Sequence, residues 1–196
     1  MEERDTDPRS GRGRLIGAVA AGAGVIVVIA IMVVGLLNQD RSNSIQQAVA
    51  EGDRPPAPEL ELPVLTGGGE IAEGETVRLS ELKGTPIVLN FWASWCTPCR
   101  SEAPILESLW QEYRGRDLLV LGVDVQDLTE NAREFDEEFG LTFPSVRDGS
   151  DSTMRDFEVR GVPETFVIDR EGRVAAVRVG PITDPGQLVP TIEDVL

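Results

Sequence analysis

Residues 90–104 read NFWASWCTPCRSEAP, and this stretch decides the fold. The overlapping run 87–93 (IVLNFWA) is almost continuously apolar and rich in strand-forming residues, which predicts a central β-strand buried on both faces. A helical pattern follows over 98–113, with apolar side chains recurring on one side. Cys96 and Cys99, the two cysteines of the chain, therefore lie where a strand passes into a helix.

This position predicts redox chemistry for the cysteine pair. Two cysteines at i and i+3 at the start of a helix lie on the same face, close enough for a disulfide. Cys96 is expected at or near the N-cap, where backbone N–H groups and the positive helix end stabilise a thiolate, the attacking species in disulfide exchange. Cys99 lies one turn further in and would act second, resolving a mixed disulfide. The alternative is an inert or static bridge, but so short a loop stabilises little through chain entropy.

Composition excludes several other classes of function. The 196 residues carry 34 acidic and 18 basic side chains, a net charge of −16 that would repel a phosphate backbone, so no nucleic-acid partner is expected. Histidine is absent, which excludes Ser–His or Cys–His catalysis and histidine-based metal sites. Two cysteines in a C-x-x-C spacing favour redox chemistry over metal binding. No metal and no cofactor beyond the redox-active cysteine pair is expected.

An uncharged apolar stretch precedes the domain. Residues 15–37 would form a helix of roughly 35 Å, long enough to cross a hydrocarbon core of about 30 Å. Arg9, Arg12 and Arg14 lie just before this stretch, which predicts a cytoplasmic tail over 1–14, a single-pass anchor in the cell membrane and an extracytoplasmic domain. A cleaved signal peptide is the alternative, with Ala48-Val49-Ala50 as its cleavage tripeptide, although signal peptides usually have an apolar region of only about 7–15 residues.

The rest of the chain divides into a linker and one domain. Residues 38–56 are polar and end in prolines, which indicates a linker, and 57–196 form the predicted domain. Further strands are expected at 59–65, 76–79, 118–123, 145–147, 164–169 and 174–179, and further helices at 129–139, 151–157 and 185–196. Strands that alternate with helices in this order predict a three-layer α/β domain with a mixed sheet.

Residues 90–104 resemble the active-site segment of the thioredoxin superfamily, and more narrowly that of the membrane-anchored TlpA, ResA and CcmG (DsbE) group. APELELP at 57–63 and GVPETFVIDREGRV at 161–174 support the resemblance. It implies a thioredoxin-like fold with an N-terminal hairpin extension and a central insert over 126–144. It also implies one transmembrane helix before the domain.

The resemblance assigns roles around the catalytic pair, Cys96 and Cys99. Trp95, Thr97 and Pro98 flank or separate the cysteines in the active-site motif, and Pro98 fits the first turn of the helix. Pro163 matches the family's cis-proline, which lies against the active-site disulfide and helps to bind an extended substrate.

Three further positions concern proton transfer. Asn90 stands where thioredoxins carry a buried aspartate that helps to deprotonate the second cysteine. Glu164 directly follows the expected cis-proline and is interpreted as a tuner or proton acceptor for Cys99, the alternative being a solvated side chain. Glu102 is the weaker candidate, because its helical position could point it outward.

The expected function is extracytoplasmic disulfide reduction in cytochrome c biogenesis. The resemblance implies that the client is apocytochrome c, and that electrons arrive through a membrane thiol transporter of the CcdA or DsbD kind. The first alternative is a general TlpA-like reductase with other clients. The others are a peroxiredoxin-type peroxidase and a non-enzymatic binding module. Peroxiredoxins carry threonine three residues before the reactive cysteine, where this chain has Ala93, and the intact C-x-x-C argues against a binding module.

The anchor predicts where the domain is found in a cell. We expect the chain to remain with the membrane fraction after a high-salt wash, with its C-terminal domain open to protease added from outside the cytoplasm. A soluble mature form with a new N-terminus near residue 51 would show instead that residues 15–37 belong to a cleaved signal.

Overall fold

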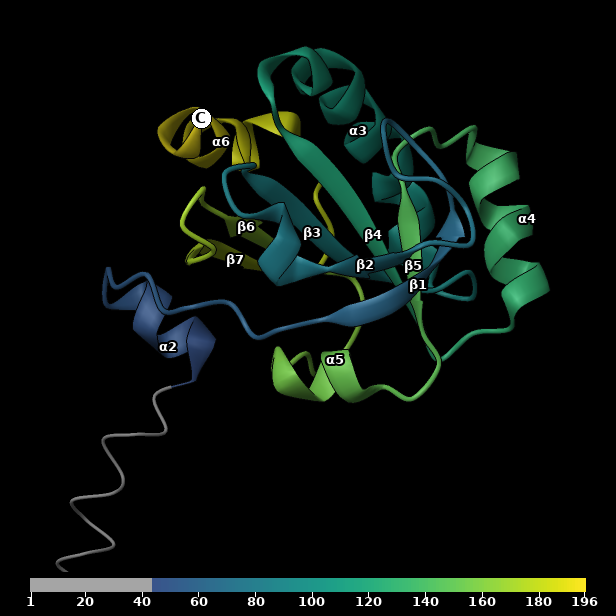
Figure 1. Ribbon diagram of the computed structural model, residues 1–196, viewed down its shortest axis with the longest axis horizontal. Coiled ribbons are helices and arrows are strands. Elements are labelled where there is room, and N and C mark those ends of the chain that lie inside the picture. Colours follow the sequence, from purple (N-terminus) through teal and green to yellow (C-terminus); the bar gives the residue numbers. More distant parts are fainter. Residues whose placement is uncertain (1–43) are drawn as a thin grey trace, which may run out of the picture. The chain divides into compact units, whose positions relative to one another are not determined.

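A mixed seven-stranded sheet organises residues 44–196, the part of the chain that the computed structural model describes (Figure 1). The strands are β1 (Glu61–Thr66), β2 (Thr76–Arg78), β3 (Ile87–Trp92), β4 (Leu119–Val125), β5 (Ser145–Asp148), β6 (Glu164–Ile168) and β7 (Val174–Val179). Their order across the sheet is β2-β1-β5-β4-β3-β6-β7. The neighbours β3, β4 and β5 are parallel, while β1, β2, β6 and β7 pair antiparallel. The predicted thioredoxin-like α/β fold with a mixed sheet is confirmed.

Helices cover both faces of the sheet. They are α2 (Ile45–Ala50), α3 (Thr97–Tyr113), α4 (Thr129–Phe139), α5 (Ser152–Asp156) and α6 (Val189–Val195), with short 3-10 turns at Leu79–Leu82, Arg114–Arg116 and Pro185–Gln187. Helices α3 and α6 lie on one side of the sheet and α5 on the other (Figure 1). The Tyr113 hydroxyl donates to Glu193 across the α3–α6 contact at 2.9 Å. This arrangement gives the three predicted layers.

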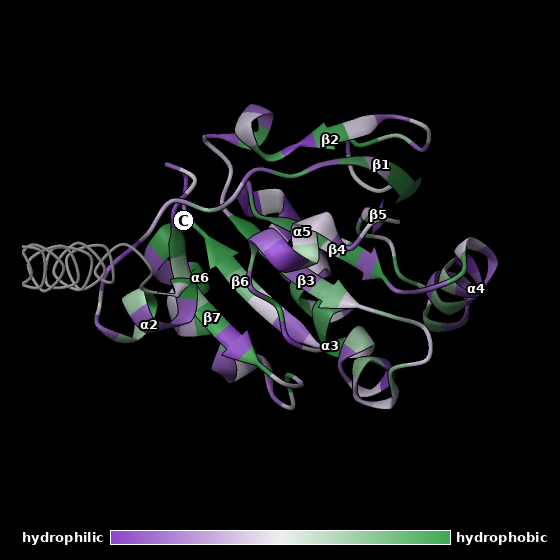
Figure 2. Cartoon of the chain, turned by 90° about the horizontal axis from the view of Figure 1, so that it is seen from below, coloured by the Kyte–Doolittle hydropathy of each residue, from purple (hydrophilic) through white to green (hydrophobic). Residues whose placement is uncertain are grey.

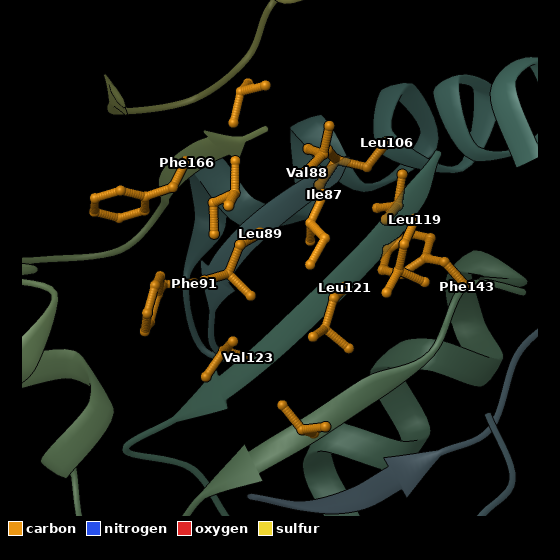
Figure 3. Close-up of a cluster of buried hydrophobic side chains, with 14 of the residues drawn as sticks. Ile87, Val88, Leu89, Phe91, Leu106, Leu119, Leu121, Val123, Phe143 and Phe166 are labelled. Atoms are coloured by element: carbon orange, nitrogen blue, oxygen red, sulfur yellow. The ribbon is translucent and has the colours of Figure 1, made fainter. Parts of the chain in front are cut away.

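Strand β3 lies at the centre of the core. Each of its residues is buried, as the apolar run predicts, and its side chains alternate between the two layers of helices. Leu89 and Phe91 point to the α5 side, where Phe91 packs against Phe157 and Phe166 with ring centroids 5.4 and 5.7 Å away. Figure 3 shows this core, and Figure 2 shows apolar residues along the central strands. The two layers leave β3 few positions for polar side chains.

The predicted N-terminal hairpin forms from β1 and β2, with Leu62 opposite Val77. Its glycine-rich loop packs closely on the segment after α4. A Cβ atom added to Gly68 would lie 2.4 Å from the carbonyl oxygen of Thr142, so no side chain fits there. The hairpin therefore extends the sheet and is fastened to the end of the central insert.

The prediction of a linker over 38–56 is wrong for residues 44–56. The folded unit begins at Ser44, not at residue 57, and α2 buries Ala48 against the domain. The chain then runs along the β6–β7 turn, where the Pro55 carbonyl accepts from the Val174 N–H at 2.8 Å. The polar, proline-rich composition predicted a linker, but a proline carbonyl oxygen still accepts hydrogen bonds, and here it ties the segment to the sheet.

The predicted cytoplasmic tail (1–14), transmembrane helix (15–37) and first linker residues (38–43) lie outside the described residues. Between residues 44 and 196, no helix combines the length and the apolar character needed to span a bilayer.

Candidate active site

The two cysteines form a disulfide at the junction of β3 and α3. Cys96 is the N-cap residue of α3, and the backbone N–H of Cys99 donates to its Sγ at 3.2 Å. The N-cap position predicted for Cys96 is confirmed. When the bond opens, the same backbone donor and the helix N-terminus face the Cys96 sulfur, and both favour its thiolate.

The neighbours of the disulfide differ sharply in exposure. Cys96 and Cys99 are only 3% and 1% exposed, whereas Thr97 and Pro98 between them are exposed. Trp95 is 58% exposed, and its indole N–H donates to the Gln126 carbonyl at 2.9 Å. An exposed turn and an indole fixed at the surface therefore border a pair of covered sulfur atoms.

Beneath the disulfide lies a small apolar cluster that contains both cysteines. Trp92, from the end of β3, stacks on Phe135 of α4 with ring centroids 4.5 Å apart, and both belong to this cluster. Gly122 on β4 makes room for the indole, because a Cβ atom there would lie 2.8 Å from Trp92 Nε1. Trp92 is therefore a packing residue, and α4 of the central insert supports the redox site through Phe135.

Asn90 of β3 and Glu102 of α3 form a buried polar pair between the strand and the helix that carries the cysteines. The Asn90 Nδ2 group donates to Glu102 Oε1 at 2.9 Å and to Thr165 Oγ1 at 3.0 Å. Glu102 Oε2 accepts from the Ile182 N–H at 2.8 Å, so each carboxylate oxygen has a donor. Burial nevertheless raises the pKa of Glu102 to about 7, and these two hydrogen bonds lower it only in part.

The expectation that Glu102 could point outward is wrong, since the side chain is 1% exposed. The helical period contained the missing signal. Glu102 lies three residues after Cys99 and four before Leu106, on the stripe that α3 buries. A carboxylate on a buried stripe needs a donor, and that donor, Asn90, lies on another element.

Asn90 also lies next to the second cysteine. A small cavity of about 10 Å³ is lined by Asn90, Cys99, Trp92 and apolar side chains. Cys99 therefore shares an enclosed space with the amide that holds Glu102. The helix contributes the carboxylate here, whereas in thioredoxins the aspartate at the position of Asn90 contributes it.

Glu164 is not brought to Cys99. In β6 it lies directly opposite Phe91, and Thr165 lies opposite Asn90. Opposed residues of an antiparallel pair point to the same face, so Glu164 lies on the α5 side and Asn90 on the α3 side. Its carboxylate accepts from Gln46 Nε2 at 2.7 Å, and burial raises its pKa. The solvated alternative is also wrong, since Glu164 is 1% exposed.

Pro163 is buried, and its peptide bond with Val162 is cis, as the resemblance implies. Val162 packs against the cluster that contains both cysteines. The cis-proline loop and the disulfide are thus parts of one site.

Comparison with known proteins agrees with this geometry. Residues 54–177 match the AhpC/TSA family. The chain belongs to the AhpC/TSA family. The match covers every strand from β1 to β6 and most of β7, and it includes the disulfide and the cis-proline.

The similar sequences include thiol-disulfide oxidoreductases and a thioredoxin-like protein. The thiol-disulfide oxidoreductase ResA of Geobacillus thermodenitrificans is 38% identical over 111 residues, 57% of this chain and 64% of that protein. The chain thus spans just under two thirds of the length of ResA. The thioredoxin-like protein YneN of Bacillus subtilis is 30% identical over 164 residues, 82% of this chain and 90% of YneN.

Solved structures give the same result. A putative thiol:disulfide interchange protein DsbE from Chlorobium tepidum is 31% identical with a TM-score of 0.65, covering 72% of this chain and 96% of that one. A DsbF homologue from Corynebacterium diphtheriae is 32% identical with a TM-score of 0.62, covering 74% and 88%. The resemblance to the TlpA, ResA and CcmG (DsbE) group is therefore confirmed for this AhpC/TSA chain.

The raised pKa of Glu102 predicts a pH dependence of stability. An acid whose pKa is about 7 in the folded state and 4.5 in its ordinary state holds its proton more tightly when folded. Its stabilising contribution is complete below pH 4.5 and is lost as the pH rises through 7. The free energy of unfolding of the wild type should therefore fall by about 2 to 3 kcal/mol more than that of Glu102→Gln over this range, at about 1.4 kcal/mol per pH unit.

Denaturant unfolding of the oxidised proteins between pH 4.5 and 8 measures this difference. Glu112→Gln changes an exposed carboxylate on the same helix and should keep the wild-type dependence. Parallel curves for the wild type and Glu102→Gln would show that Glu102 does not titrate in this range.

Proposed function

We propose that this chain is a thiol–disulfide oxidoreductase that reduces protein disulfides outside the cytoplasm. The observation that carries the proposal is the Cys96–Cys99 disulfide at the N-terminus of α3, with a backbone N–H directed at the Cys96 sulfur. The likeness to ResA and to a DsbE structure supports it.

In the proposed reaction the dithiol form of the protein meets an oxidised client. The Cys96 thiolate attacks one sulfur of the client disulfide, and the other client sulfur leaves as a thiolate that takes up a proton. Cys99 then loses its proton and attacks the Cys96 sulfur, which releases the second client thiol. The client gains two electrons and two protons, and this protein ends with the Cys96–Cys99 disulfide.

The charge of Glu102 favours electron flow from this protein to its client. It lies one helical turn after Cys99 and shares Asn90 with it as a neighbour. When ionised, a carboxylate there opposes a negative charge on a nearby thiol, and no histidine in the chain can offset it. A strong oxidant requires a very stable thiolate, so this charge arrangement favours a reductant.

Apocytochrome c is the client we propose, with its haem-attachment cysteines kept reduced, and the electron donor is a membrane thiol transporter of the CcdA or DsbD kind. The TlpA, ResA and CcmG resemblance supports both partners. A general reductase with other clients is the alternative, and YneN, similar over most of its length, is named only as thioredoxin-like. The apolar stretch 15–37 supports a membrane-anchored location with the catalytic domain outside the cytoplasm.

Substitution of each cysteine tests the proposed chemistry and its order. Cys96→Ser should abolish the reduction of insulin, because the attacking sulfur is lost. Cys99→Ser should accumulate mixed disulfides through Cys96, because the resolving sulfur is lost. Non-reducing electrophoresis followed by mass spectrometry identifies the trapped clients in cells. Mixed disulfides that form through Cys99 in Cys96→Ser would reverse the assignment, and trapped clients without c-type haem motifs would favour the general reductase.

The reduction potential decides the direction of electron flow. We expect a value nearer that of thioredoxin, about −270 mV, than the strongly oxidising value of about −120 mV. The difference of about 150 mV corresponds to about 7 kcal/mol for two electrons, so one measurement separates the cases. Equilibration of residues 44–196 with glutathione or dithiothreitol, followed by tryptophan fluorescence, gives the value, since Trp92 packs in the cluster that contains the disulfide. A potential above about −150 mV would contradict the reductase proposal and indicate an oxidase.

A further inference from the structure

The helix α2 joins the N-terminal part of the chain to the cis-proline side of the domain. In Figures 1 and 2 it lies beside β7. The Ile45 N–H donates to Glu158 Oε2 at 3.2 Å, and Gln46 Nε2 donates to Glu164 Oε1 at 2.7 Å. The contacts of α2 with Glu158 and Glu164 therefore lie on either side of the loop over 159–163.

Glu164 connects this helix to that loop. Its carboxylate accepts from Gln46 Nε2, and Glu164 directly follows Pro163 in the chain. One buried residue therefore receives a donor from α2 and is bonded directly to the cis-proline at the end of the loop.

The same loop contacts the redox site. Val162 packs against the cluster of both cysteines, and the Pro163 carbonyl accepts from the Gly180 N–H at 3.0 Å. Pro163 is bonded directly to Glu164, so the hydrogen bond from Gln46 to Glu164 holds the end of this loop. A change at Gln46 is thus transmitted through Glu164 to residues that border the disulfide.

We propose that Gln46 is a positioning residue for client binding, which rests on the proposed disulfide reductase function. Through Glu164 it holds the 160–163 loop in the conformation that receives the client chain. The segment that connects the domain to residues 1–43 is then part of the client site, and release of α2 weakens client binding without changing the chemistry of the cysteines.

The side chain of Gln46 can be tested apart from the helix that carries it. Ala48 is buried, and Ile45 and Val49 pack against the core, so α2 keeps its apolar contacts when Gln46 changes. Gln47 is the matched control, because its Nε2 donates only within the helix, to Glu51 at 3.0 Å. Gln46→Met keeps the bulk of the side chain and removes the donor.

The experiment combines hydrogen exchange with steady-state kinetics on the full chain. In Gln46→Ala and Gln46→Met, the Gly180 amide, which donates to the Pro163 carbonyl, should exchange about tenfold faster, as expected for the loss of a hydrogen bond to a charged group. The KM for insulin, with glutathione as reductant, should rise about threefold to tenfold at unchanged kcat. The rate at which iodoacetamide alkylates reduced Cys96 should stay the same, because that small reagent does not use the loop. Gln47→Ala should match the wild type in all three measurements.

The outcomes separate this inference from the function on which it rests. Unchanged exchange at Gly180 in both Gln46 variants overturns the link from α2 to the loop, whatever the activity. Faster exchange with an unchanged KM overturns the role in client binding. If exchange is faster in the Gln46 variants but the wild-type protein reduces no insulin, the proposed reductase function is contradicted and the client role of Gln46 falls with it. The link between helix and loop would still stand.

Discussion

The hydrogen bond from Asn90 to Glu102 joins the central strand to the redox helix, and the site depends on it. A buried carboxylate without donors costs several kcal/mol, so Glu102 can stay inside only where donors meet it. Asn90 supplies one from β3, and the Ile182 N–H supplies the other from the segment after β7. Two elements far apart in sequence are thereby fixed against the helix that begins at Cys96. The same arrangement places a carboxyl group with a pKa of about 7 behind the second cysteine.

The sheet separates the two buried glutamates by function. Because side chains alternate along a strand, adjacent positions on β6 serve opposite layers. Thr165 faces the α3 side and completes the hydrogen bonds of Asn90, while Glu164 faces the α5 side, directly after the cis-proline, and accepts the Gln46 side chain of α2. One carboxylate therefore lies by the sulfur chemistry and the other by the loop that borders it. A shift of one residue in the register of β6 would exchange these two environments and disable both.

The sequence predicted most of the fold, because each element has a strong local signal. The apolar run of β3, the cysteine spacing and the helical period of α3 are local patterns, and they placed Cys96 at the N-cap correctly. The errors concern side chains whose surroundings come from distant residues. Glu102 and Asn90 are 12 positions apart, and Gln46 and Glu164 are 118 apart. The period of α3 places Glu102 on the buried stripe, but no periodicity within one element reports which distant donors it meets there. The resemblance could not supply them either, because it points to Glu164 through its place beside Pro163 and not through the face of the sheet on which it lies.

The absence of histidine makes these buried carboxylates the groups that bring proton exchange near neutral pH. Carboxyl groups in water lose their protons near pH 4, far below the range in which thiols exchange. Burial raises the pKa values of such groups. The pKa of Glu102 rises to about 7. The pKa of Asp136, an α4 residue that accepts from the Thr66 hydroxyl of β1, rises to about 6. The packing of α3 on the sheet therefore does more than stabilise the domain. By excluding water from Glu102, it turns an ordinary acid into one whose charge can change near pH 7.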